Sequence, residues 1–176
     1  MKRQQLLLLI LAFGVFSILN TEMGIIGILP MAAEMYQVDI VQAGMLVSLF
    51  ALGVAIAGPT MPLLFSRFNR KHVMLLVLGV FTICNALAVV ASDFQLLLVL
   101  RVVPAFFHPV YCALAFSVAA ASVAPEDAPR AVARINMGVA AGMVVGVPIS
   151  NVLAATFDFS MAMVFFAGVT GLMFLL

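Results

Sequence analysis

Charged residues are scarce in this sequence. Asp, Glu, Lys and Arg together account for 9% of its 176 residues, whereas a soluble domain contains roughly 25%. Hydrophobic residues account for 66% and the mean hydropathy is +1.29, so the composition excludes an ordinary soluble globule and is typical of a helical membrane protein. The net charge of +1 supplies no basic surface for a nucleic acid, and we expect no nucleic-acid partner.

Cysteines and catalytic motifs are equally scarce. The two cysteines, Cys84 and Cys112, lie in apolar runs, which argues against an extracellular disulfide framework. His108 lies four residues before Cys112, but no further His, Cys or carboxylate lies beside them at metal-ligand spacing, and we predict neither a metal site nor a cofactor. The chain contains no nucleophile-elbow, zinc-protease or phosphate-loop motif, so it is not expected to be an enzyme.

Long apolar runs fill the chain instead. Each run approaches or exceeds the ~18 to 20 residues that cross about 30 Å of hydrocarbon. They predict an all-α membrane protein with six transmembrane helices, at approximately 5–29, 40–65, 73–92, 95–122, 135–157 and 160–176. The connections between the runs are too short for a soluble domain, so residues 1–176 are expected to form one six-helix transmembrane domain.

The basic residues predict the orientation of this domain. Lys2 and Arg3 followed by an apolar run imitate a secretory signal, but the run is too long and no cleavage-like site ends it, so we expect an uncleaved first helix. Lys and Arg near span ends are retained in the cytoplasm. One predicted side holds Lys2, Arg3, Arg67, Arg70, Lys71, Arg130 and Arg134, and the other holds Glu34, Asp39, Asp93 and Asp158. The amino terminus is therefore predicted to be cytoplasmic.

Two ionisable residues lie within the predicted spans and are candidates for function. A charge in hydrocarbon costs at least ~2.5 to 3.5 kcal/mol, so it normally faces a partner or a water-filled cavity. Glu22 lies ~12 Å and Arg101 ~10 Å below the same membrane surface at 1.5 Å per residue. We hypothesise that both face one polar interior, where Glu22 gains and loses a proton and Arg101 is its electrostatic partner. A purely structural ion pair is the alternative.

Polar neighbours extend this candidate site. Asn20 and Thr21 add hydrogen-bonding groups beside Glu22, and His108 lies on the same helix face as Arg101, about two turns deeper. These residues are predicted to line a proton or substrate cavity. The alternative for His108 is a core histidine bonded to a backbone carbonyl that Pro104 or Pro109 leaves free.

The fifth predicted span carries a strip of glycines. Gly138, Gly142 and Gly146 recur every four residues, and Pro148 follows them. A strip without side chains lets another helix approach closely, and the proline bends the helix end. The strip is compatible with simple tight packing and with a seam along which two helices move.

Residues 58–71, after the second span, resemble the loop signature G-x3-D-R-x-G-R-R/K of the major facilitator superfamily. The segment begins at Gly58, and its basic residues fit the signature at Arg67, Arg70 and Lys71. The sequence departs from the signature at three positions, with Pro62, Ser66 and Asn69 in place of Gly, Asp and Gly. These charges are expected to stabilise one conformation through helix ends and carboxylates, or only to fix the topology.

Two further segments resemble motifs of the same superfamily, in the same order. Arg101 matches the arginine of the fourth-helix motif, and residues 138–148 resemble the fifth-helix antiporter motif of proton-coupled exporters. Residues 21–30 and 101–108 are most similar to the drug and sugar efflux branch, which includes arabinose, purine-nucleoside and chloramphenicol exporters.

The resemblance implies the amino-terminal half of a twelve-helix transporter in a bacterial inner membrane. Its expected function is proton-coupled efflux of a small organic molecule such as a drug, sugar or nucleoside. In such folds the substrate site lies between two halves, so the expected partners are substrate, protons, the lipid bilayer and a missing carboxyl-terminal half or a second copy. A proton-independent facilitator and a non-transporting fragment are the alternatives.

Overall fold

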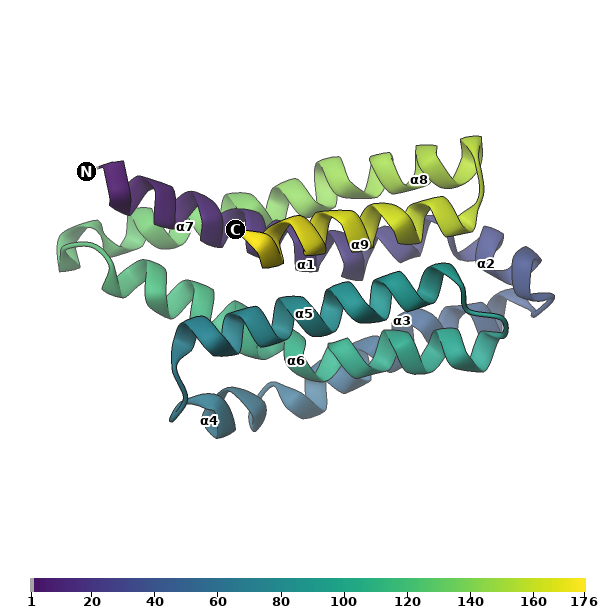
Figure 1. Ribbon diagram of the computed structural model, residues 1–176, viewed down its shortest axis with the longest axis horizontal. Helices are drawn as coiled ribbons and strands as arrows, with labels where there is room; N and C mark the ends of the chain where they lie inside the picture. Colours follow the sequence, from purple (N-terminus) through teal and green to yellow (C-terminus); the bar gives the residue numbers. More distant parts are fainter. Residues whose placement is uncertain (1) are drawn as a thin grey trace.

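A computed structural model describes residues 2–176, and all the regular structure in that range is helical (Figure 1). The elements are α1 (Lys2–Gly27), α2 (Leu29–Tyr36), α3 (Ile40–Ala57), α4 (Met61–Phe65), α5 (Arg70–Val89), α6 (Phe94–Ala121), the 3-10 turn η1 (Pro125–Asp127), α7 (Ala128–Ala141), the π-helix η2 (Gly142–Gly146), α8 (Val147–Thr156) and α9 (Phe159–Leu175).

Five helical stretches are long and apolar enough to cross a membrane. They are Arg3–Gly27, Ile40–Ala57, Arg70–Val89, Phe94–Ala121 and Pro125–Thr156. The shorter apolar helix α9 lies in the sixth predicted span. The predicted fold class, an all-α bundle of membrane helices, is therefore confirmed.

Two of the predicted spans are each divided into two helices, and prolines explain both divisions. The run 40–65 is not one helix: α3 ends at Ala57, and Pro59, which has no N–H to continue the helical ladder, lies in the break before α4. The run 5–29 is divided at Ile28, because Pro30 occupies the first turn of α2, where a proline needs no donor. Proline thus starts a new helix where hydropathy alone predicts a continuous one.

The fifth span also departs from a regular helix. The helical stretch begins at Ala128, earlier than the predicted 135, and continues through α7, η2 and α8. The π-helix η2 covers Gly142–Gly146 and ends two residues before Pro148. A π turn of this kind changes the hydrogen-bond register of a helix locally. The hydrogen-bond register of the helix therefore changes just before Pro148, which cannot donate a main-chain hydrogen bond.

Helix α1 occupies the middle of the bundle. It contacts α3, α6, α7, η2, α8 and α9, while α5 lies against α6 and α9 on the side shown in Figure 1. Tyr36 at the end of α2 donates a hydrogen bond to the main-chain oxygen of Ala91 at 3.1 Å. Burial, and secondarily the charge of Asp93, raises the pKa of Tyr36, which keeps the phenol protonated and able to donate.

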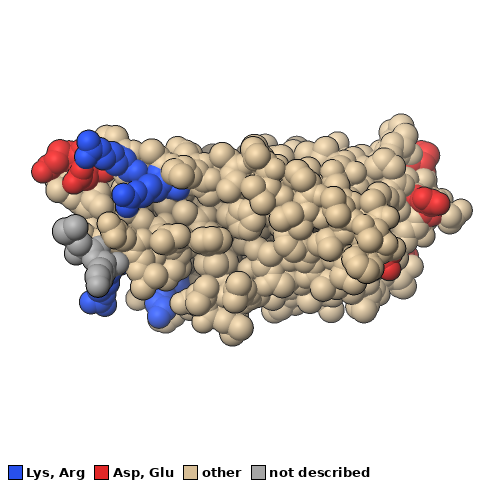
Figure 2. Space-filling model, turned by 90° about the horizontal axis from the view of Figure 1, so that it is seen from above, with Lys and Arg blue, Asp and Glu red and all other residues tan. Residues whose placement is uncertain are grey.

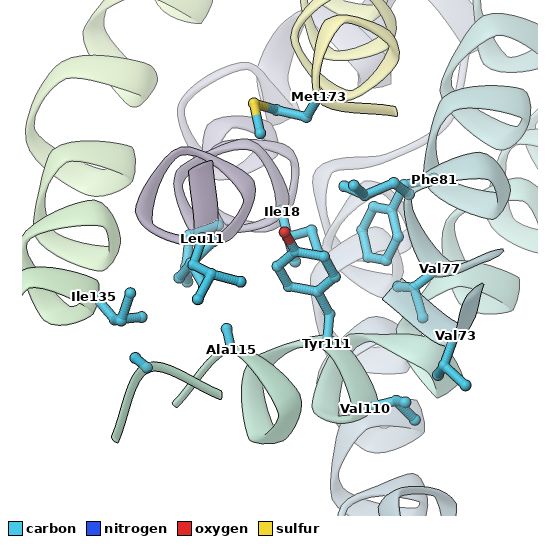
Figure 3. Close-up of a cluster of buried hydrophobic side chains, with 14 of the residues drawn as sticks. Leu11, Ile18, Val73, Val77, Phe81, Val110, Tyr111, Ala115, Ile135 and Met173 are labelled. Carbon is cyan, nitrogen blue, oxygen red and sulfur yellow. The ribbon is translucent and has the colours of Figure 1, made fainter. Parts of the chain in front are cut away.

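Two apolar clusters form the core at the two ends of the bundle. The first, around Ile18, Phe81 and Tyr111, joins the amino-terminal part of α1 to α5, α6 and α7 (Figure 3). The second, around Leu97 and Phe166, joins the end of α1 to α3, α6 and α9. The side chain of Tyr111 occupies the space where Gly14 of α1 lacks a Cβ, so the glycine fixes how α6 packs on α1.

Charged side chains gather at the two ends of the bundle. Figure 2 shows Lys and Arg at the end that holds the amino terminus and the α6–α7 connection, with some acidic residues beside them, and only Asp and Glu at the opposite end. Arg3 exposes its side chain at the first of these ends, and the side chain of Lys2 lies outside the described residues. In the face that Figure 2 shows, the described residues place no charged side chain along the long middle, as a bilayer-facing surface requires.

Candidate functional site

A layer of buried polar side chains lies between the two apolar clusters. Helix α1 passes from the first cluster, which contains Leu19, to the second, which contains Ile25. Between them lie the buried Asn20 and Thr21 and the largely buried Glu22. Asn85 of α5 and Arg101 and His108 of α6 are buried as well. The predicted residues of spans one and four thus meet in one layer, joined by a residue of α5.

Arg101 holds the main chain of α1. Its side chain is 2% exposed, Nη1 donates a hydrogen bond to the Thr21 oxygen at 2.8 Å, and Nη2 donates one to the Glu22 oxygen at 3.4 Å. Its guanidinium carbon lies 5.0 Å from the ring centroid of Phe50 on α3, a favourable position over an aromatic face. The rigid fork of arginine suits two acceptors at once. Arg101 therefore ties three helices together at the level of Glu22.

The carboxylate of Glu22 contacts His108. Oε2 of Glu22 lies 2.9 Å from Nε2 of His108, and their side chains are 17% and 11% exposed. The Sγ of Cys112 lies 3.9 Å from the same ring nitrogen, and the ring of Phe50 meets the imidazole edge to face at 6.0 Å. The contact becomes an ion pair when the imidazole is protonated and the carboxylate is not.

The structure brings both Arg101 and His108 to Glu22, but the guanidinium reaches its main-chain oxygen and the imidazole its carboxylate. Side chains on a helix lean toward its amino terminus, and α6 runs antiparallel to α1. The Glu22 side chain therefore leans toward the deeper His108, while Arg101 leans the other way and meets main-chain oxygens. The alternative prediction for His108, a bond to a carbonyl freed by proline, differs from the structure, since Nδ1 has no hydrogen-bond partner among the described residues.

A chain of hydrogen bonds supports the layer from α5. Asn85 Nδ2 donates to Thr21 Oγ1 at 3.2 Å, and that hydroxyl donates to the main-chain oxygen of Ser17 at 3.1 Å. Asn85 is 3% exposed and is not among the site residues that the sequence predicts. It is the one carboxamide in the predicted span 73–92, a signal that could have found it because buried amides require partners.

The glycine strip of the fifth span lies directly on α1. A Cβ on Gly138 would overlap the main chain of Ala12, one on Gly142 would press on the main chain of Phe16, and one on Gly146 would overlap the side chain of Asn20. Both amide atoms of the buried Asn20 are without hydrogen-bond partners among the described residues. Asn20 thus belongs to the layer by its position along α1, but its side chain faces the π-helix.

The seam between the fifth span and α1 continues into α8. Ser150 Oγ lies 3.4 Å from the Gly24 oxygen, and Asn151 fills the space that Gly27 leaves open. Pro148, which follows the strip in sequence, is exposed on another face of α8. The three glycines therefore share one interface, and the proline does not belong to it.

The basic loop lies at one end of the bundle, away from the polar layer. Gly58 ends α3, and the side chains of Arg67, Arg70 and Lys71 are exposed. The Asn69 side chain caps α5 by accepting a hydrogen bond from the Lys71 main-chain N–H at 3.0 Å. Positive charges in the first turn of a helix oppose its dipole, so Arg70 and Lys71 gain nothing from the dipole of α5. The structure does not bring the loop together with Glu22.

A model of the Major Facilitator Superfamily matches residues 11–176. The chain is 35% identical over 161 residues to the inner membrane transport protein YdhP of Escherichia coli, covering 92% of this chain and 41% of that protein. It is 30% identical over 151 residues to the putative transporter AraJ of the same organism, covering 86% of this chain and 38% of that protein.

A solved structure shares the fold. It is a bacterial homolog of the human lysosomal transporter Spinster in an inward-facing and occupied conformation, with a TM-score of 0.81 and 19% sequence identity. The match covers 97% of this chain and 43% of that protein. The chain thus spans about two fifths of the length of the proteins it matches and corresponds to their amino-terminal half.

Proposed function

The chain belongs to the Major Facilitator Superfamily, and from that premise we propose that it forms half of a transporter that exports a small organic molecule in exchange for protons. One observation carries this proposal: the carboxylate of Glu22, within the bundle, lies 2.9 Å from the imidazole of His108. Two groups that both bind protons and touch each other inside a membrane protein suit a proton-binding site better than a structural contact.

Protonation of Glu22 changes how strongly α1 is held to α6. The ionised carboxylate attracts a protonated His108 and the guanidinium of Arg101, which lies at the same level, whereas the neutral acid retains only a hydrogen bond. A ligand shifts a conformational equilibrium only by its different affinity for two states. Proton binding from outside therefore favours the conformation in which α1 is less tightly held, and substrate leaves in the opposite state.

Arg101 keeps the site in place during this cycle. Its hydrogen bonds go to main-chain oxygens of Thr21 and Glu22, which do not titrate. The arginine therefore positions the proton-binding residue and holds a positive charge nearby in both protonation states. Thr21 and Asn85 brace the same turn from the α5 side.

The substrate site is completed by a second unit. In transporters built from two repeats, substrate binds near the bilayer midplane between the halves, and this chain supplies one such face. A carboxyl-terminal half supplies the other, or a second copy of the chain does so. Hydroxyl-bearing sugars, nucleosides and lipophilic drugs all fit the class of small organic substrate.

The charge distribution supports a cytoplasmic amino terminus. The exposed Lys and Arg side chains gather at the end of the bundle that begins α1 (Figure 2), and loops rich in these residues stay on the cytoplasmic side. The relative YdhP is named an inner membrane protein. We place the chain in a bacterial inner membrane on these grounds.

The test is the substitution Glu22→Gln in the protein as its locus encodes it, with any sequence that continues the reading frame. Labelled arabinose, inosine or chloramphenicol is added outside inverted vesicles, and uptake into the vesicles is measured with and without an imposed pH gradient. Glu22→Gln should abolish the part of uptake that the gradient drives, because glutamine cannot bind or release the proton.

A matched control uses the same chemical change at a surface carboxylate. Glu34 is exposed at the acidic end of the bundle, and Glu34→Gln should transport as the unaltered protein does. Gradient-driven uptake that survives Glu22→Gln would refute the proton-binding role of Glu22. Uptake that ignores the pH gradient in the unaltered protein would instead indicate a facilitator.

A further inference from the structure

A groove runs along the outside of the bundle between α1 and the α7–η2 helix. Its volume is about 670 Å³. Apolar side chains make up its walls: Leu9, Phe13, Phe16, Met137, Ala141 and Val145. Gly138 lies at its base, where the missing side chain lets α7 touch the main chain of Ala12. None of the groove's lining residues belongs to the polar layer around Glu22.

One end of the groove is polar and cationic. Gln5 and Arg134 line it there, and both residues also line an adjoining pocket of about 200 Å³ that includes Arg130 and Asp127. Arg130 lies 3.4 Å from Asp127, but both side chains are exposed and such a pair holds little energy. Among the described residues, no carboxylate lies within ion-pair distance of Arg134. The end of the groove therefore offers a free guanidinium.

The length of the groove matches one leaflet of a bilayer. Arg134 and Val145 are eleven residues apart on one helical stretch, which is ~16 Å at 1.5 Å per residue. Half of a hydrocarbon core of about 30 Å is ~15 Å. A small solute would fill only part of such a groove, whereas one acyl chain extends along all of it.

The charge at the mouth selects the headgroup. Basic pockets between transmembrane helices on the cytoplasmic side hold anionic lipid headgroups, and arginine binds phosphate through two parallel hydrogen bonds. We infer that the groove between α1 and α7–η2 binds one acyl chain of an anionic phospholipid, whose phosphate Arg134 holds with Arg130 beside it. The bound chain lies against the Gly138 contact, where the two helices meet.

The chain contains no tryptophan, which makes a site-specific fluorescence test practicable. Phe13→Trp places a tryptophan in the groove, at a position already 54% exposed, and Leu9→Trp is a second reporter on the same wall. Any tryptophan encoded outside these 176 residues is first replaced by phenylalanine. Phe174→Trp, on α9 and outside the groove, is the matched control. Each variant of the protein as its locus encodes it is placed in phosphatidylcholine vesicles that contain either brominated phosphatidylglycerol or brominated phosphatidylcholine at equal mole fraction.

At Phe13→Trp and Leu9→Trp, the apparent affinity for brominated phosphatidylglycerol, obtained from quenching, should be about five times that for brominated phosphatidylcholine. This ratio is the effect of roughly one basic residue near an anionic surface. Phe174→Trp should show no preference. Adding Arg134→Gln to either reporter should remove the preference, whereas Arg67→Gln, an exposed arginine elsewhere, should keep it.

Two results would overturn the inference. Equal quenching by both lipids at the groove reporters would mean ordinary annular lipid without headgroup selection. Absence of quenching at the groove reporters, with normal quenching at Phe174→Trp, would mean that protein rather than lipid covers the groove. Neither result depends on transport, so the inference and the proposed proton coupling fail separately.

Discussion

At the scale of single residues, the buried charges have different partners. Arg101 binds main-chain oxygens of α1, and Glu22 contacts the imidazole of His108. A hydrogen bond to a charged group contributes about 1.5 to 3 kcal/mol, and leaving a buried group without its partner costs a similar amount. The two α6 residues therefore have different roles: Arg101 fixes the turn of α1, and His108 contacts the carboxylate that we propose binds the proton.

Substitution of Arg101 tests the first of these roles. Arg101→Met should lower the free energy of unfolding by about 1.5 to 3 kcal/mol, because Thr21 and Glu22 lose a charged donor. Arg101→Lys should recover only part of this loss, since an ammonium lacks the rigid fork that serves two acceptors. Unfolding by a denaturing detergent, followed by circular dichroism, measures both losses.

The control for this comparison is Arg67→Met, at an exposed position outside the layer, which should leave the free energy of unfolding unchanged. Equal losses for Arg101→Lys and Arg101→Met would contradict the importance of the guanidinium geometry.

At the scale of elements, the fifth span is built to lie directly on α1. The glycines of α7 and η2 bring main chain against main chain, and the π-helix changes the register between Gly142 and Gly146. Close approach of this kind is how helices associate where there is no water to drive them together. The same contact has no bulky side chains that would hinder a small relative movement of the two helices.

Two glycine-to-alanine substitutions should change stability in opposite directions. Gly138→Ala should lower the free energy of unfolding by about 1 to 3 kcal/mol, because the new Cβ meets the main chain of Ala12 and overpacking forces the helices apart. Gly168→Ala on α9 meets nothing within 4 Å and should raise it by about 0.5 to 1 kcal/mol through helix propensity. The same unfolding assay compares them. A neutral or stabilising Gly138→Ala would contradict the close packing of α7 on α1.

At the scale of the whole molecule, the bundle has two unlike ends and a polar layer between two apolar clusters. The Lys and Arg side chains at one end predict which side of the membrane it faces. The layer lies between these two ends, and the Glu22 side chain in it is 17% exposed. A residue that exchanges protons at this depth therefore needs a path that opens to one side and then to the other, as alternating access provides.

Cysteine labelling tests the orientation. With Cys84 and Cys112 replaced, Ser66→Cys at the basic end should resist a membrane-impermeant maleimide applied to intact cells. Ser92→Cys at the opposite end should react, because both positions are exposed and lie beyond the two opposite ends of α5. The reverse pattern would place the amino terminus outside the cytoplasm.

Most of the fold was predictable from the sequence because membrane solvation acts on local composition. Apolar runs of the right length must be helical, since the bilayer offers no partner for a free main-chain N–H or oxygen. That argument alone identified the helical class, the approximate spans and the buried positions of Glu22 and Arg101. It failed at Ile28, at 58–60 and at 142–146, where the helix breaks or changes register beside glycine or proline.

The pairing within the site was decided only by the tertiary structure. The sequence placed a carboxylate and a guanidinium at similar depth in the membrane and an imidazole about two turns deeper, but it did not determine which of them touch. The contact of Glu22 with His108 depends on the axial register of α1 against α6, which Tyr111 sets by filling the space beside Gly14. Register arises from packing between segments almost a hundred residues apart in the chain, and no local pattern encodes it.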